Sequence, residues 1–316
     1  MGQFIYHTIA RADVDSAIRH FQKAIELDPN FALAYSALGG CYVNRVLKGL
    51  GDPGDHAKAE KAFNQALAID PRLLEARLHM VFIYLSRGNK PKAREEVERL
   101  RQEYPNDVGV HFARGVLARL DSQYDRALRS FDRMVKLNPA EVVVASYNRA
   151  RLFAYQGRYE EALRQLDKGA ALEPEHPLIQ AFRAFVFYYQ GRVEEATQLL
   201  LQVLERHPSI DGLRPILAIF LSFQGKHGAA SEQLTQRVKQ VAASDHDISY
   251  WLASAYLLQG KQVEAFRWFE TSIDLGNENY QWFLADPNWT DMHEDPRFQK
   301  LISRIQRSPD KEDNAG

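Results

Sequence analysis

Alanines recur through this 316-residue chain at an almost constant interval. They stand 34 or 35 residues apart, except for one interval of 42. A bulky apolar residue follows each alanine by four positions, and a proline follows six of them by twelve. A period of this length restricts the fold to an array of similar units, each burying its apolar face against its neighbours. The alanines are Ala17, Ala59, Ala93, Ala127, Ala162, Ala196, Ala230 and Ala265.

Each unit has the pattern of two helices. Ala17, Phe21 and Ile25 are spaced as one face of a helix, and Tyr35 and Tyr42 mark a helix earlier in the next unit. Five alanines are preceded, five residues earlier, by a glycine that can adopt the left-handed conformation and turn the chain between helices. The prolines cannot continue a helix interior, so they separate the units. The chain is therefore predicted to be all-α. The glycines are Gly88, Gly157, Gly191, Gly225 and Gly260.

The pattern resembles the tetratricopeptide repeat (TPR), a helical hairpin of about 34 residues. The resemblance covers about residues 3–276 and implies a right-handed α–α superhelix of about eight hairpins, a TPR solenoid, within residues 1–276. The first helix of the first repeat is truncated or degenerate. The pentatricopeptide repeat, which reads RNA, lacks this spacing of alanine and proline. In the second repeat the matching residues are Tyr35, Leu38, Gly39, Tyr42, Ala59, Phe63, Ala66 and Pro71.

Two irregularities interrupt the array. The second repeat carries an 8-residue insertion within residues 43–58, where four Gly or Pro residues predict a turn. A longer first helix with a tolerated loop is the simpler interpretation, and a functional protrusion is the alternative. The seventh repeat lacks its proline, which predicts a wider junction near residues 242–247.

Residues 277–307 depart from the repeat and are predicted to cap the last apolar face. Asp286-Pro287 and Asp295-Pro296 each have the pattern of an N-cap followed by the first helical residue. Residues 308–316 are predicted to be disordered. The short pattern around these Asp-Pro pairs resembles the end of TPR regions in bacterial multidomain signalling proteins, namely Ser/Thr kinases, adenylate cyclases and winged-helix regulators.

Composition and motifs argue against several functions. The formal net charge of −1 disfavours a nucleic-acid partner, and no apolar run is long enough for membrane insertion. The single cysteine excludes an internal disulfide. No histidine pair has metal-ligand spacing, and no nucleotide-binding or nucleophile motif is present. We therefore expect no catalytic residues, no metal and no cofactor, and a cytoplasmic protein that is not an enzyme.

One polar position repeats among the first helices of the repeats, at Arg114, Arg149 and Arg183. Eighteen residues later stand Asp132, Asp167 and Leu201. Because that separation brings two positions of one hairpin together, the pattern predicts the ion pairs Arg114–Asp132 and Arg149–Asp167. Arg183 is left without an acid.

The resemblance also implies a binding surface, since first helices line the concave face of TPR arrays. Counting the inward positions gives an aromatic lining with arginines near its middle, and these residue types dominate binding hot spots. The alternative is that the aromatic residues pack against the next repeat. The two-carboxylate clamp of chaperone-binding TPR domains is not expected, because its Lys and Asn positions are not matched. The predicted groove residues are Phe82, Phe112, Arg119, Tyr147, Arg151, Tyr155, Phe182, Phe185, Tyr189, Phe223 and Tyr250.

Two functional hypotheses follow. The first is an interaction scaffold that binds a peptide or partner domain in this groove. The second is a regulatory or sensor segment of a larger bacterial signalling enzyme or transcription regulator, with its effector domain upstream. The sequence leaves self-association into a homo-oligomer open.

Overall fold

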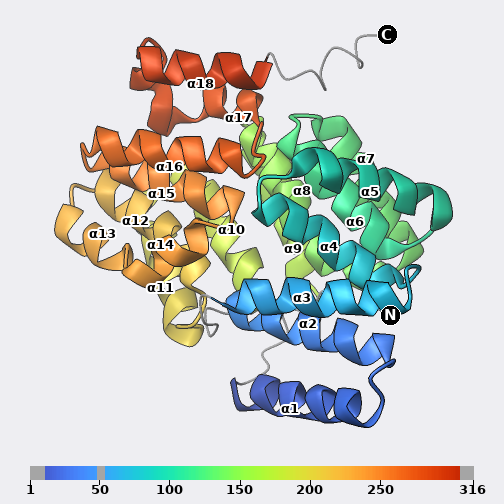
Figure 1. The fold of residues 1–316 in the computed structure, drawn as a ribbon. Coiled ribbons are helices and arrows are strands. Elements are labelled where there is room, and N and C mark those ends of the chain that lie inside the picture. Colours follow the sequence, from blue (N-terminus) through green and yellow to red (C-terminus); the bar gives the residue numbers. More distant parts are fainter. Residues whose placement is uncertain (1–10, 48–53, 307–316) are drawn as a thin grey trace.

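The computed structural model describes residues 11–47 and 54–306, and all regular structure in these residues is helical. Seven helical hairpins follow α1 (Arg11–Leu27), which is the second helix of the first repeat (Figure 1). The prediction of an all-α TPR solenoid is confirmed. The hairpins are α2 (Ala32–Leu47) with α3 (Asp55–Ile69), α4 (Leu74–Ser86) with α5 (Lys90–Glu103), α6 (Val108–Leu120) with α7 (Tyr124–Leu137), α8 (Val142–Tyr155) with α9 (Tyr159–Ala170), α10 (Pro177–Tyr189) with α11 (Val193–Arg206), α12 (Arg214–Phe223) with α13 (His227–Gln233), and α15 (His246–Leu258) with α16 (Gln262–Asp274).

Shorter elements complete the described chain. The 3-10 helices η1 (Pro139–Glu141) and η2 (Asp211–Leu213) lead into α8 and α12. The C-terminal part contains α17 (Tyr280–Ala285), η3 (Pro287–Met292) and α18 (Pro296–Gln306). No helix among the described residues has both the length and the apolar character needed to cross a bilayer.

The repeat alanines and the turn glycines have the structural roles that the sequence predicts. From Ala59 onward all seven repeat alanines have no exposed surface, so the two helices of each hairpin approach closely there. The five turn glycines have φ values between 70° and 80°, in the left-handed region. In the fourth repeat the same turn is made by Ser122, with φ 61°.

The two irregularities also have structural counterparts. Helix α2 extends to Leu47 and is longer than the other first helices, and α3 begins at Asp55. Most of the insertion between them lies outside the described residues. In the seventh repeat the second helix is broken after Gln233. A separate helix, α14 (Gln236–Ala242), follows, and the side chain of Thr235 is its N-cap. The junction near residues 242–247 is itself a short turn, so the irregularity lies earlier than the missing proline predicts.

The predicted ion pairs Arg114–Asp132 and Arg149–Asp167 are wrong, because Asp132 and Asp167 each pair with an arginine of the following repeat. Arg149 binds Asp132 at 2.5 Å and Arg183 binds Asp167 at 2.8 Å, so each arginine reaches the second helix of the preceding repeat. The first helix of a repeat lies between its own second helix and the preceding one, and spacing within one hairpin cannot distinguish the two. Arg114 makes no ion pair within the part of the chain that the structure describes.

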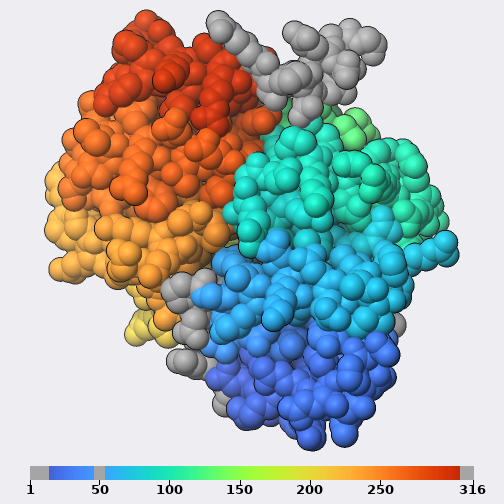
Figure 2. Space-filling view, in the orientation of Figure 1, coloured from blue at the N-terminus to red at the C-terminus, as the bar shows by residue number. Residues whose placement is uncertain are grey.

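The superhelix curves until its C-terminal repeats meet its N-terminal half. Figure 2 shows the α15–α16 region packed directly against the helices from α3 to α5. A Cβ atom added to Gly88, between α4 and α5, would lie 2.3 Å from the carbonyl oxygen of Asp274 at the end of α16. Lys90 binds Glu278 at 3.1 Å, and the hydroxyl of Ser244 lies 3.1 Å from Nε2 of His56. The array is therefore closed into a compact body.

Candidate functional site: the concave face

The concave face is filled by residues 277–292 of the same chain, hereafter the C-terminal strap. The strap leaves α16 and crosses to the turn after α6, where the amide of Glu278 donates to the carbonyl of Leu120 at 3.0 Å. The side-chain oxygen of Asn279 accepts from the hydroxyls of Tyr124 at 2.6 Å and Ser122 at 3.1 Å. Residues more than 150 positions apart are thus joined by hydrogen bonds.

Trp282 is the apolar anchor of the strap. Its ring stacks on Tyr155 with centroids 4.4 Å apart, and Tyr189 meets it edge-on at 5.3 Å. Phe185 completes the contact at 6.3 Å. Only 4% of Trp282 is exposed, so the strap buries a large aromatic surface against three of the predicted groove residues.

Asp286 is the polar anchor. Its carboxylate accepts hydrogen bonds from the hydroxyls of Tyr250 at 2.9 Å and Tyr189 at 3.2 Å. It also accepts from the amide of Asn288 at 3.0 Å, so it is the N-cap of η3 as the sequence predicts. Burial raises the pKa of Asp286 to about 6, although these hydrogen bonds act in the opposite direction.

The raised pKa gives a pH prediction. Between about pH 4 and pH 6 the folded chain keeps the Asp286 proton that the unfolded chain loses. We therefore expect Asp286→Asn to gain stability relative to the wild type as the pH rises through this window, by no more than about 3 kcal/mol. Urea unfolding of both proteins at pH 4, 5, 6 and 7 measures the difference. A difference that stays constant with pH contradicts the prediction.

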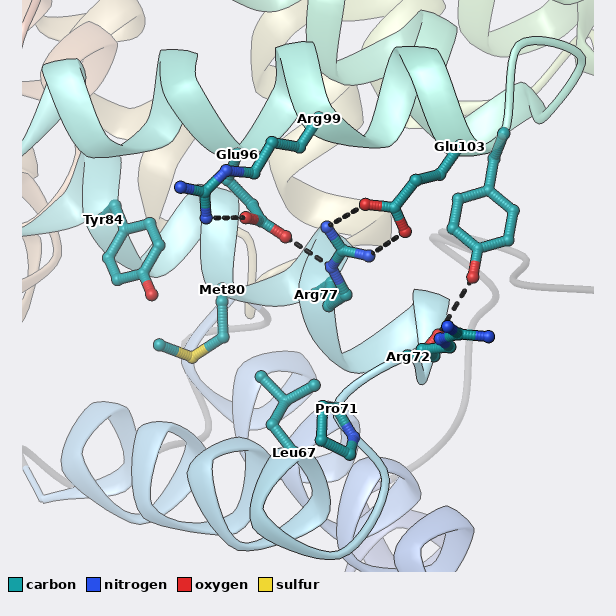
Figure 3. Close-up of a pocket in the computed structure, with 10 residues that line it drawn as sticks. Leu67, Pro71, Arg72, Arg77, Met80, Tyr84, Glu96, Arg99 and Glu103 are labelled. Carbon is teal, nitrogen blue, oxygen red and sulfur yellow. Dashed lines mark hydrogen bonds and ion pairs between the residues drawn. The ribbon is translucent and has the colours of Figure 1, made fainter.

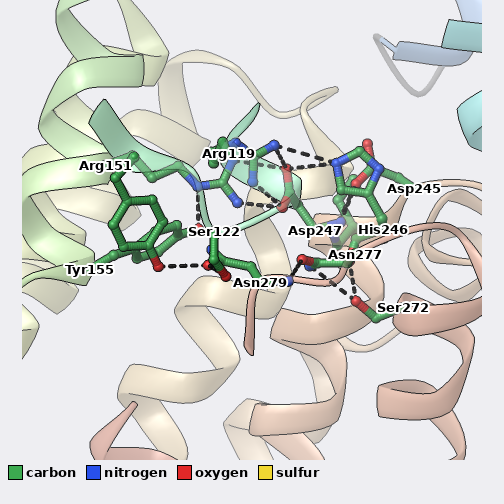
Figure 4. Close-up of polar contacts among 12 residues, drawn as sticks. Arg119, Ser122, Arg151, Tyr155, Asp245, His246, Asp247, Ser272, Asn277 and Asn279 are labelled. Carbon is green, nitrogen blue, oxygen red and sulfur yellow. Dashed lines mark hydrogen bonds and ion pairs between the residues drawn. The ribbon is translucent and has the colours of Figure 1, made fainter. Parts of the chain in front are cut away.

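A second polar cluster closes the concave face beside the strap (Figure 4). Asp247, in the first turn of α15, accepts two hydrogen bonds from Arg119 of α6 in a bidentate arrangement, both at 2.9 Å. Arg151 of α8 donates to the same carboxylate at 2.8 Å and to the hydroxyl of Tyr155. The guanidinium of Arg151 also lies 5.2 Å from the ring centre of Trp251.

This cluster is almost fully buried. Arg119 is 3% exposed and Arg151 is 7% exposed. Burial by itself raises the pKa of Asp247, but Arg119 and Arg151 outweigh it and hold that pKa well below its usual value. Two guanidinium groups thus surround one carboxylate, and their hydrogen bonds hold α6 and α8 against α15.

The predicted groove residues therefore fall into three groups. Seven are buried by the strap, by α15 or by one another: Arg119, Tyr147, Arg151, Tyr155, Phe182, Phe185 and Tyr250. Tyr189 is half-buried against the strap. Phe82 and Phe112 are half-buried and contact each other at 5.8 Å, and Phe223 is 60% exposed.

Sequence reasoning named the aromatic residues that contact the strap but missed the polar residues that hold its two ends. Ser122 stands where five other repeats have the turn glycine, and its hydroxyl also accepts from the amide of Gln281 at 3.3 Å. The departure from glycine was a signal in the sequence. Asp247 stands in the first helix of the last repeat, but nothing in the sequence indicates its pairing with arginines of distant repeats, and Asn279 lies outside the repeats.

The strap is the first part of the segment 277–307 predicted to cap the last repeat, and the rest of that segment packs on α16. Trp289 has no exposed surface, and its indole NH donates to Ser254 at 2.9 Å. Asp295 accepts from the amide of Arg297 at 2.8 Å, so it caps the start of α18. The apolar residues of α18 are buried, with Phe298 5.8 Å from Phe269 of α16. The last residues of the chain, from 307 on, lie outside the described residues.

A separate cleft of about 730 Å³ lies between α3, α4 and α5 (Figure 3). Its central charge, Arg77, binds Glu96 and Glu103, each at 2.5 Å. Tyr104 at its edge donates to the carbonyl of Arg72 at 3.2 Å. The central charges are balanced among themselves, which indicates a structural role. Among the described residues no group of three His, Cys, Asp or Glu could hold a metal ion.

Comparisons with known proteins agree with this fold. Two family models described as tetratricopeptide repeat match residues 52–117 and 153–218, and residues 9–73 and 221–280. Anaphase-promoting complex subunit 3 of Schizosaccharomyces pombe is 23% identical over 50% of this chain and 23% of its own length. Superkiller protein 3 of the same organism is 22% identical over 58% of this chain and 13% of its own length. The chain therefore spans about a quarter or less of the curated relatives it matches.

Solved structures show the same architecture. The APC/C hetero-tetramer Cut9–Hcn1 is similar with a TM-score of 0.60 and 14% identity, over 93% of this chain and 59% of that chain. The human IFIT1 dimer with PPP-AAAA has a TM-score of 0.58 and 15% identity, over 83% of this chain and 68% of that chain. These identities establish the fold alone. Together with the two family models, which match well over half of the sequence, they show that the chain belongs to the tetratricopeptide-repeat family, whose members are in general protein-interaction scaffolds.

Proposed function

We propose that this chain is a protein-interaction scaffold without catalysis of its own, and that its concave face binds a partner segment carrying an aromatic side chain and a carboxylate. The observation that carries the proposal is the strap itself. Tyr155 and Tyr189 contact the ring of Trp282, and Tyr250 and Tyr189 donate to Asp286. The concave face thus already binds a segment with an aromatic ring and a carboxylate, the two groups that we expect in a partner segment.

A partner segment has to replace the strap, because both would use the same aromatic residues. The strap is tethered, and a tethered segment acts at an effective concentration in the millimolar range. A free peptide of equal affinity therefore competes poorly with the intact strap. Weakening the strap should expose the binding capacity of the face.

The experiment uses a fluorescein-labelled peptide of residues 277–295 and the full chain with Trp282→Ala. We expect micromolar binding to this variant by fluorescence anisotropy, and binding at least about tenfold weaker to the wild type, because the intact strap competes. Trp268→Ala on α16 is the matched control, since Trp268 lies outside the strap, and it should behave as the wild type.

Two further measurements test the contact itself. The peptide carrying Trp282→Ala should not bind, and the double variant Tyr155→Ala, Trp282→Ala should not bind the wild-type peptide, because its stacking partner is gone. Equal binding of the peptide to the wild type and to Trp282→Ala, or binding to neither, would show that the concave face is only a packed interior.

The alternative, a regulatory segment of a larger signalling protein, rests on the Asp-Pro pattern near the C-terminus. Trp289 and Phe298 of that pattern are core residues of the cap, and this packing explains them without a partner. The regulatory role, a cytoplasmic location and self-association stay predictions.

A further inference from the structure

A strongly basic cleft of about 500 Å³ lies between α5 and α7, the second helices of two successive repeats. Five arginines line it and one carboxylate, Glu98, faces them. This charge imbalance distinguishes it from the cleft around Arg77, whose central charges are paired. The arginines are Arg101, Arg114, Arg126, Arg129 and Arg133.

Most of this positive charge is not neutralised by the protein. Glu98 is engaged by Arg101 of the same helix, with Nε and Oε1 2.8 Å apart. Among the residues that the structure describes, the side chains of Arg126 and Arg133 donate only to the neutral amides of Gln123 at 3.1 Å and Asn106 at 2.7 Å. Arg129 is exposed and, within the described residues, forms no ion pair.

Arg114 is the member of the cleft that the repeat pattern marks as unusual. The arginines at its position in the next two repeats, Arg149 and Arg183, each bind an aspartate of the preceding second helix. Glu98 stands at the corresponding place for Arg114, but it is held by Arg101. Burial, with Arg126 and Arg101 nearby, lowers the pKa of Arg114. An anion in the cleft would relieve this repulsion.

His111 adds an unsatisfied polar atom to the cleft. The residue is 6% exposed, and its Nε2 lies 3.0 Å from the carbonyl of Pro105, so this nitrogen carries the proton. Its Nδ1 is then an acceptor, buried without a hydrogen-bond partner among the described residues, so the arginines and not His111 are the donors to an anion. Buried polar atoms of this kind are uncommon in folded proteins.

We propose that this cleft binds the phosphate group of a phosphorylated serine or threonine in a partner protein. Guanidinium forks match phosphate oxygens in pairs, and a phosphoryl group supplies close to two negative charges and three acceptor oxygens. A single carboxylate supplies less charge. The one carboxylate of the cleft, Glu98, is already bound by Arg101. The net charge of −1 for the whole chain disfavours a nucleic-acid backbone as the ligand.

The test measures binding of the full chain to a fluorescein-labelled peptide mixture with one fixed phosphoserine and randomised flanking positions. The same mixture with serine, and with glutamate, at the fixed position are the parallel probes. We expect binding of the phosphoserine mixture that weakens as salt is raised, binding of the glutamate mixture weaker by about tenfold, and none of the serine mixture.

Substitutions locate the site. Arg114→Gln and Arg129→Gln should each weaken phosphopeptide binding by about tenfold, since each removes a charge-assisted donor. Arg164→Gln is the matched control, because Arg164 is also exposed and stands two residues after its repeat alanine, as Arg129 does. It should change the affinity by less than about twofold, the scale expected for a distant surface charge. Trp282→Ala should leave this binding unchanged, which separates the cleft from the concave face.

Several results overturn the proposal. One is absence of binding by the phosphoserine mixture, and another is equal binding of the serine mixture. A third is an equal effect of Arg129→Gln and Arg164→Gln, which would place binding elsewhere. Inorganic phosphate is the last probe. If it competes with an affinity equal to that of the peptides, the site binds a small anion and not a partner's phosphorylated side chain.

Discussion

Replacing Asp247 by asparagine should lower the free energy of unfolding by about 4 kcal/mol, because it leaves two buried guanidinium groups without their counter-charge. Arg119 and Arg151 approach this carboxylate from α6 and α8 at 2.8–2.9 Å. Asparagine keeps the size of the side chain, so the loss reports charge and not a cavity. Urea unfolding at pH 7 measures it.

Asp132→Asn is the matched control. Asp132 also pairs with an arginine, but 56% of its side chain is exposed, and exposed pairs contribute at most about 1 kcal/mol. Equal losses from the two substitutions would show that the Asp247 cluster is no stronger than a surface pair.

The pH dependence of this cluster has the opposite sign to that of Asp286. A carboxylate whose pKa is held low in the folded state stabilises the fold above its unfolded pKa, near 3.9, and this stability is lost as the pH falls. The wild type should therefore lose its advantage over Asp247→Asn in acid, whereas Asp286→Asn gains over the wild type between about pH 4 and pH 6.

Local structure could be predicted from the sequence because each repeat position has one local role. The repeat alanines are buried at helix contacts, the turn glycines have positive φ, and Asp286 and Asp295 cap the helices that follow them. Each of these assignments depends on a few neighbouring residues. The period predicts about eight hairpins, and the described residues contain seven hairpins preceded by α1.

Closure of the array could not be predicted, because it joins residues that are far apart in sequence. Arg119 and Asp247 are separated by 128 positions, and Tyr124 and Asn279 by 155. Such contacts depend on the accumulated rotation between hairpins, which no single repeat specifies. The resemblance therefore predicts a set of inward-facing side chains, and the three-dimensional structure shows that the chain's own strap contacts several of them.

The clearest test of closure is Gly88→Ala, which should cost roughly 4 kcal/mol, combining the strain of a left-handed alanine with overpacking. Gly88 has φ 70°, and its new Cβ atom would lie 2.3 Å from the carbonyl oxygen of Asp274. A backbone oxygen cannot move aside as a side chain can. The contact between the α4–α5 turn and the end of α16 would therefore have to open.

Gly157→Ala separates the two contributions. Gly157 makes the same turn with the same φ of 70°, but nothing lies within 4 Å of its added Cβ atom. We expect this control to cost only about 1–2 kcal/mol, the strain of a left-handed alanine. The remaining difference in urea unfolding is the contribution of closure. Hydrogen exchange should also increase in residues 274–282 of Gly88→Ala and not of Gly157→Ala, because the strap follows directly from that contact. Equal costs, with equal protection of the strap, would mean that the two ends of the superhelix only touch and do not stabilise each other.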